Sequence, residues 1–212
     1  MEHTANQITL RGSLASLPQF SHENHGKRFC RFFLEVERLS GAVDTLPVVA
    51  REELLKALDL GPGIRLTARG QVRSHNHTDV SGRHLMVFVF ASDLWAEDGE
   101  PVNEVTLTGL LCREPTFRRT PLGREICDAM LAVPRAFKRA DYLPCIAWGT
   151  LARQCGDLNV GDAIALEGRL QSRTYTKRLG EEVQERTAFE ISIMSMDLLC
   201  EPRYLREIRG KE

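Results

Sequence analysis

The chain of 212 residues is long enough for one large domain or for two of about 100 residues, and its 42% apolar and 27% charged residues are typical of a folded protein. It has no long apolar run and no basic and apolar leader at its start, which excludes a membrane-spanning helix and an export signal, so we expect a cytoplasmic protein. The net charge of −1 excludes coating of a nucleic acid by bulk charge alone, so any such function must rest on a local patch.

The sequence repeats itself at a shift of 97 residues. Placing residues 6–54 over 103–151 gives 17 identities in 49 positions, and after one inserted residue the shift of 98 continues to residue 180. The identical pairs include Gly12/Gly109, Cys30/Cys127, Arg38/Arg135, Asp44/Asp141, Gly70/Gly168 and Ser74/Ser172. The repeat predicts an N-terminal domain at 1–95, a linker at 96–102, a C-terminal domain at 103–200 and a short extension at 201–212.

Hydrophobic periodicity predicts the same elements in each copy. In the first copy Leu54, Leu55 and Leu58 have the spacing of a short helix. In the second copy three strands at 103–109, 126–133 and 143–148 precede a helix with Leu151, Ala152 and Cys155 on one face, and strands at 163–175 and 185–194 follow, joined through Gly180. This order predicts an all-β fold with short helices, built as two tandem five-stranded OB-fold barrels; a split β-sandwich fits less well.

The cysteines and histidines show no metal-site or disulfide pattern. No two of the six cysteines lie within four residues of each other, which predicts reduced and mostly buried thiols. The pairs His22/His25 and His75/His77 lie in polar stretches that resemble turns, and we interpret them as solvated loop residues rather than zinc ligands. We therefore expect no metal and no cofactor.

The second copy resembles the bacterial single-stranded DNA-binding protein family along nearly its whole length, and the first copy matches the same frame more weakly. The residues that carry the resemblance are Asn103, Val105, Leu107, Gly109, Pro115, Gly123, the run from Leu143 to Gly149, Leu151, Ala152, Gly161, the run from Glu167 to Gln171, Tyr175 and Gly180. The resemblance implies a nucleoid-associated protein that binds and protects single-stranded DNA without sequence preference during DNA replication, recombination or repair.

Four aromatic residues match the positions at which family members stack DNA bases. They are Phe137, Tyr142, Trp148 and Tyr175. Because every base has a π-face, stacking binds a strand without reading its sequence. The alternative is that these aromatics belong to the core, which is most plausible for Trp148 at the end of an apolar strand.

Basic residues surround these aromatics in the sequence and are candidates for phosphate contacts; a solvated surface charge is the alternative for each. The candidates are Arg118, Arg119, Arg135, Lys138, Arg139, Arg169, Arg173, Lys177 and Arg178.

The first copy lacks most of these side chains while keeping the glycines and apolar strands. Ser40, Thr45, Arg51 and His77 stand opposite the four aromatics, and Gln71, Asp79 and Val80 stand opposite Arg169, Lys177 and Arg178. This pattern predicts a structural or assembly role for the first domain, with at most weak strand contacts through Lys27, Arg28, Arg38 or Arg51. The resemblance also implies four OB domains per particle, which a two-domain chain would reach as a homodimer.

Two other functions are compatible with the sequence, and a third is disfavoured. Family members usually end in a flexible acidic tail that recruits replication and repair proteins, and the absence of such a sequence before Glu212 favours a primosome-type accessory protein that binds single strands and a replication partner. An RNA-binding OB module would use the same stacking chemistry. An enzyme is disfavoured because Asp128, Asp141, Asp157 and Asp162 are scattered and no phosphate-binding glycine motif occurs.

Overall fold

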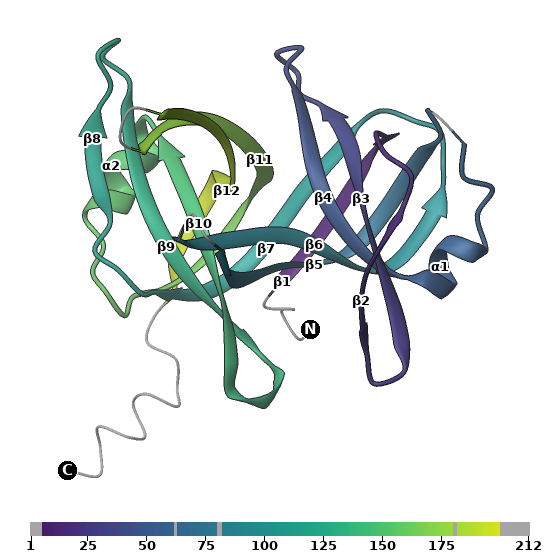
Figure 1. Ribbon diagram of the computed structural model, residues 1–212. Coiled ribbons are helices and arrows are strands. Elements are labelled where there is room, and N and C mark those ends of the chain that lie inside the picture. Colours follow the sequence, from purple (N-terminus) through teal and green to yellow (C-terminus); the bar gives the residue numbers. More distant parts are fainter. Residues whose placement is uncertain (1–5, 62, 80–81, 180–181, 200–212) are drawn as a thin grey trace. The chain divides into compact units, whose positions relative to one another are not determined.

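The structure is a computed structural model that describes residues 6–61, 63–79, 82–179 and 182–199 (Figure 1). Contacts within the chain divide it into two compact units. We call the unit with residues 7–105 and 170–190 the N-terminal unit, and the unit with residues 106–169 and 191–199 the C-terminal unit. The outer part of the last hairpin, 170–190, therefore packs with the first repeat rather than with the rest of the second.

The first repeat forms a closed five-stranded ring. Its elements are β1 (Asn6–Leu14), β2 (Gln19–Asn24), β3 (Lys27–Glu37), β4 (Val43–Arg51), α1 (Glu52–Lys56), β5 (Arg65–Asp79) and β6 (Gly82–Ala96). Strand β1 pairs with both β3 and β5, β5 pairs with β6, and β4 pairs with β3 on one side and in parallel with β6 on the other. Alternate side chains of each strand fill the interior of the ring. On β1, Ile8, Leu10 and Leu14 are buried, and the residues next to Ile8 and Leu10 are more exposed.

The second repeat has the same connectivity. Its elements are β7 (Val102–Leu111), β8 (Thr116–Arg119), β9 (Glu125–Arg135), the 3₁₀ turn η1 (Ala136–Lys138), β10 (Arg139–Trp148), α2 (Thr150–Gly156), β11 (Ala163–Leu179) and β12 (Glu182–Leu199). The strands follow the order β7-β11-β12-β10-β9, β10 and β12 are parallel, and β9 returns to β7. The prediction of two tandem OB folds is confirmed.

Glycines shared by the repeats mark where strands of each ring approach closely. A Cβ atom at Gly70 would collide with the Phe90 carbonyl oxygen, and one at Gly168 would collide with the Ser192 carbonyl oxygen. Neither glycine has a positive φ, so the requirement is space between backbones rather than backbone freedom.

Several predicted boundaries were wrong. The short edge strands β2 and β8 were missed because their residues are exposed and do not alternate in polarity. Helix α1 ends at Lys56, so Leu58 lies outside it. Strands β11 and β12 extend beyond the predicted 163–175 and 185–194, and the predicted turn at Gly180 lies outside the described residues.

The prediction that His22, His25, His75 and His77 lie in loops was largely wrong, but the prediction that they are exposed to solvent was right. His22 lies in β2 and both His75 and His77 lie in β5, so only His25 is in a turn. All four are exposed to solvent. Among the described residues no group of three or more His, Cys, Asp or Glu side chains could hold a metal ion.

The cysteines of the described ranges form no disulfide with one another. Cys30, Cys127, Cys145 and Cys155 are buried and Cys112 is partly exposed, while Cys200 lies outside the described residues. Burial raises the pKa of Cys155 to about 12, with a further contribution from the neighbouring Cys127. No helix in the described part of the chain is long and apolar enough to cross a membrane.

Candidate nucleic-acid interface

Strand β10 presents two aromatic side chains on the outside of the second repeat. Tyr142 is 47% exposed and Trp148 is 40% exposed, while Leu143, Cys145 and Ala147 between them point inward and are buried. Because side chains alternate along a strand, Tyr142 and Trp148 lie on the same side of β10, about 20 Å apart at about 3.3 Å per residue, with the buried Ile146 between them. The core interpretation of Trp148 is therefore wrong.

Phe137 lies at the tip of the β9–β10 hairpin and is 94% exposed. Phe137 and the adjacent Lys138 both have positive φ, at 60° and 54°, which is uncommon for residues other than glycine. The hairpin below the tip is regular, with Arg135 opposite Arg139. The turn thus holds an aromatic ring away from the barrel, between basic residues and in contact with solvent.

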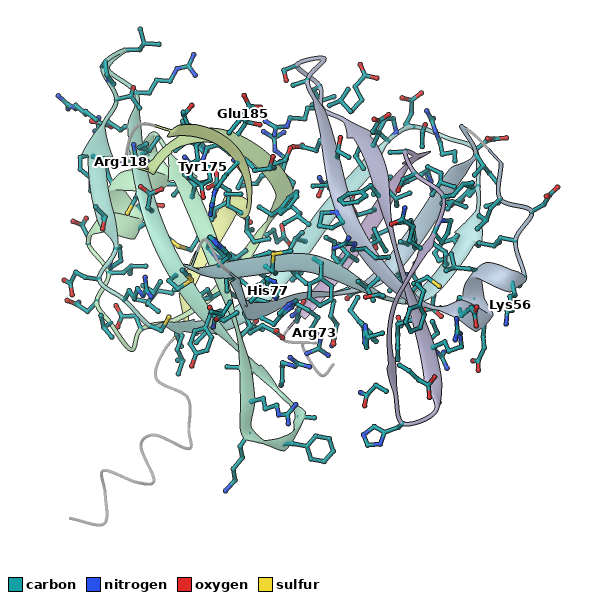
Figure 2. All side chains as sticks on the ribbon, in the orientation of Figure 1. Lys56, Arg73, His77, Arg118, Tyr175 and Glu185 are labelled. Carbon is teal, nitrogen blue, oxygen red and sulfur yellow. The ribbon has the colours of Figure 1, made fainter. Side chains whose placement is uncertain are left out.

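Tyr175 lies on β11 in the part of that strand that belongs to the N-terminal unit (Figure 2). Its ring is 38% exposed, and the guanidinium carbon of Arg173 lies 5.9 Å from the ring centroid. Arg173 Nε donates to Glu190 Oε2 at 3.3 Å, and Gln171 Nε2 donates to the other oxygen of Glu190 at 2.9 Å. Tyr175 is therefore backed by a cation that a buried carboxylate on β12 holds in place.

Several of the predicted phosphate-contacting arginines make ion pairs within the protein. Arg118 Nε lies 2.7 Å from Asp128, and Arg135 lies 3.4 Å from the buried Asp141. Arg119 shares Glu125 with Arg153, which the prediction did not include. Hydrogen bonds from Arg153, the larger effect, and from Arg119 lower the pKa of Glu125. Part of the hydrogen-bonding capacity of these arginines is therefore used within the protein.

The remaining predicted phosphate contacts differ in how accessible their side chains are. Lys138 and Arg139 are exposed at the hairpin tip beside Phe137. Arg169 is partly buried, and its Nε atom has no hydrogen-bond partner within the described part of the chain. The side chains of Lys177 and Arg178 lie outside the described residues.

The structure divides the predicted aromatics between the units. Phe137, Tyr142 and Trp148 lie in the C-terminal unit and Tyr175 lies in the N-terminal unit. All four side chains are exposed to solvent.

The first repeat places aromatic rings near Arg28, a predicted weak strand contact, that the prediction did not name. Arg28 of β3 lies over the exposed ring of Phe20 at 4.6 Å, and His22 stacks on Phe29 with ring centroids 4.8 Å apart. These residues do not align with the family's stacking positions, and only the pairing of β2 with β3 brings them together. The aligned positions Ser40, Thr45 and His77 are exposed, but none of them is Phe, Tyr or Trp.

The second repeat is similar in sequence to known proteins. The sequence profile of the Single-strand binding protein family matches residues 102–199. Single-stranded DNA-binding protein A of Bacillus subtilis is 34% identical over 89 residues, which are 39% of this chain and 52% of that protein. A Lactococcus lactis single-stranded DNA-binding protein is also 34% identical, over 59% of its length.

The chain thus spans about half the length of the curated relatives that it matches. A solved structure resembles the whole chain. The wild-type single-stranded DNA binding protein from Thermus aquaticus has a TM-score of 0.76 at 22% identity, covering 93% of this chain and 94% of that one. At this identity the likeness shows a shared tandem OB fold and assigns no role to any residue.

Proposed function

We infer that the protein binds single-stranded DNA without sequence preference and shields it during replication, recombination or repair. The observation that carries this inference is the line of outward aromatics on the second repeat, Tyr142 and Trp148 on β10 and Phe137 at the tip beside exposed Lys138 and Arg139. Exposed rings next to cations suit a strand whose bases stack while its phosphates meet charge. The relatives named as single-stranded DNA-binding proteins support the same function.

We propose that the two repeats have different roles. The domain at 103–200 holds DNA, and the domain at 1–95 supports the assembly, because its aligned positions Ser40, Thr45, Arg51 and His77 carry no Phe, Tyr or Trp. A homodimer would place four OB domains in one particle, as the resemblance to the family implies.

The proposed activity is binding without catalysis. Asp128 and Asp141, two of the carboxylates that a nuclease would direct at metal ions, are instead paired with Arg118 and Arg135. Paired carboxylates on separate strands support a passive role.

The test of this function is a competition experiment with a fluorescein-labelled dT oligonucleotide followed by anisotropy. Unlabelled dT should displace the probe, duplex DNA of equal nucleotide concentration should not, and an rU oligonucleotide measures the preference for DNA. Binding should weaken with salt, with log K falling by about 0.7 per phosphate contact for each tenfold rise in salt. Displacement by duplex as effective as by dT would contradict the proposal.

A further inference from the structure

A buried carboxylate of the first repeat holds the strand that carries Tyr175. Asp44, at the start of β4, is fully buried. Its Oδ1 atom accepts hydrogen bonds from the backbone N–H of Ser172 at 2.7 Å and from the Ser172 hydroxyl at 2.8 Å. Asp44 and Ser172 are both part of the N-terminal unit, although 128 residues separate them in sequence.

Arg38 completes this cluster. Its Nε donates to Asp44 Oδ2 at 2.6 Å, and its Nη2 donates to the carbonyl oxygen of Ser172 at 3.2 Å. Both backbone polar groups of Ser172 are therefore bonded to the Arg38–Asp44 pair. Hydrogen bonds to a charged partner are worth about twice as much as neutral ones, so this is a strong point of attachment for β11.

The attachment lies three residues before Tyr175. Between them, Arg173 is held by Glu190 and lies against the Tyr175 ring, and Gln171 on the other side of Ser172 donates to the same Glu190. Asp44 and Glu190 thus fix successive residues of β11 from two sides. A second contact within the unit joins β12 to the first repeat, since Arg186 Nη1 lies 2.9 Å from His84 Nδ1.

We propose that Asp44 and Arg38 are positioning residues for single-stranded DNA binding: the first repeat holds β11 through Ser172 so that the Tyr175 ring is ordered before a base arrives. This rests on the proposed function. A side chain ordered in advance loses less freedom on binding, so removing the attachment lowers affinity without removing any group that touches DNA.

A double-mutant cycle in the full chain tests this. Asp44→Asn, Tyr175→Ala and the double variant are compared by dT-oligonucleotide anisotropy. Tyr175→Ala should weaken binding about 5- to 150-fold, the loss of one stacked base. Asp44→Asn should weaken it by up to the same factor, and the double variant should bind within about twofold of Tyr175→Ala. The proposal would be overturned if the loss of affinity in the double variant equalled the product of the two single losses, or if Asp44→Asn kept full affinity.

Further variants separate positioning from loss of fold. Ser172→Ala, which removes only the hydroxyl donor, should give a smaller loss that Ser172→Thr restores. Glu97→Gln is the matched control, because Glu97 is also a carboxylate of this unit and accepts hydrogen bonds from Arg11, Thr67 and Trp95, none of which lies on β11. Its dT affinity should equal that of the wild type; a loss as large as that of Asp44→Asn would contradict a specific attachment.

Hydrogen exchange without DNA gives a readout that does not depend on the proposed function. The amide of Ser172 donates to Asp44, so Asp44→Asn should speed the exchange of residues 171–176 while Glu97→Gln leaves it unchanged. If the wild type fails to bind dT, the proposed function fails while this measurement still decides the attachment. Unchanged exchange in Asp44→Asn would overturn it.

Discussion

Replacing Tyr142 and Tyr175 together by alanine is expected to weaken dT-oligonucleotide binding by about 2–6 kcal/mol, because each base stacked on an aromatic ring contributes about 1–3 kcal/mol. Both rings are exposed, so their loss should leave the core and the thermal unfolding midpoint nearly unchanged. Anisotropy of a labelled dT oligonucleotide at fixed salt measures the loss.

The internal repeat supplies the control for this experiment. Thr45 and His77 occupy the aligned positions in the first repeat and are also exposed. Thr45→Ala with His77→Ala should change the affinity little, because Thr45 has no ring and the small imidazole of His77 offers less stacking area than the phenol ring of tyrosine. Equal losses from the two pairs would mean that the repeats share the binding, and no loss from the tyrosine pair would remove the stacking mechanism.

Asp44→Asn is expected to lower the free energy of unfolding at pH 7 by about 3 kcal/mol, the lower end of the cost of removing one partner from a buried ion pair. The substitution leaves the guanidinium of Arg38 without its anion, and the Arg38 side chain is only 22% exposed. Urea unfolding of the two proteins under identical salt measures the difference.

This difference should depend on pH. Burial acts to raise the pKa of Asp44, but hydrogen bonds from Arg38 and from Ser172 outweigh it and hold the pKa below its ordinary value. A carboxylate whose pKa is lower in the folded state stabilises the fold above its unfolded pKa of about 3.9, and this stabilisation is lost as the pH falls through the folded value. The gap between wild type and Asp44→Asn should therefore be constant above about pH 5 and shrink below about pH 4. A gap that persists unchanged to pH 3 would contradict the role of the charge.

The repeat and its periodicity were sufficient to predict the barrels, because buried strands and helices leave a regular pattern of apolar residues. The identity of Asp44 with Asp141, and of Ser74 with Ser172, was also visible in the sequence. The role of Asp44 in holding Ser172 could not be predicted from the sequence, because nothing in the sequence around a carboxylate beside a polar loop indicates that it is buried. Only the fold reveals that Asp44 is inaccessible and that its partner lies 128 residues away.

Some residues of the candidate interface could be predicted from the sequence and others could not, for similar physical reasons. Phe137 lies among cations in the sequence, which indicated exposure, whereas Trp148 ends an apolar strand and only the pleat shows that its ring points outward. The pairing of Arg118 with Asp128 depends on the register of β8 against β9, and β8 itself was not predicted. A count of basic residues therefore overestimates the charge that is ready to meet a phosphate.

Trp148 provides the measurement that tests the central claim most directly. The chain has two tryptophans, so a Trp95→Phe protein has Trp148 as its single indole reporter on β10. Titration with a dT oligonucleotide should quench this fluorescence in a saturable way, because a stacked base contacts the ring, while Trp95 in a Trp148→Phe protein should respond little. Saturable binding by anisotropy with no change in Trp148 fluorescence would show that the strand does not stack on β10 and would contradict the proposed interface.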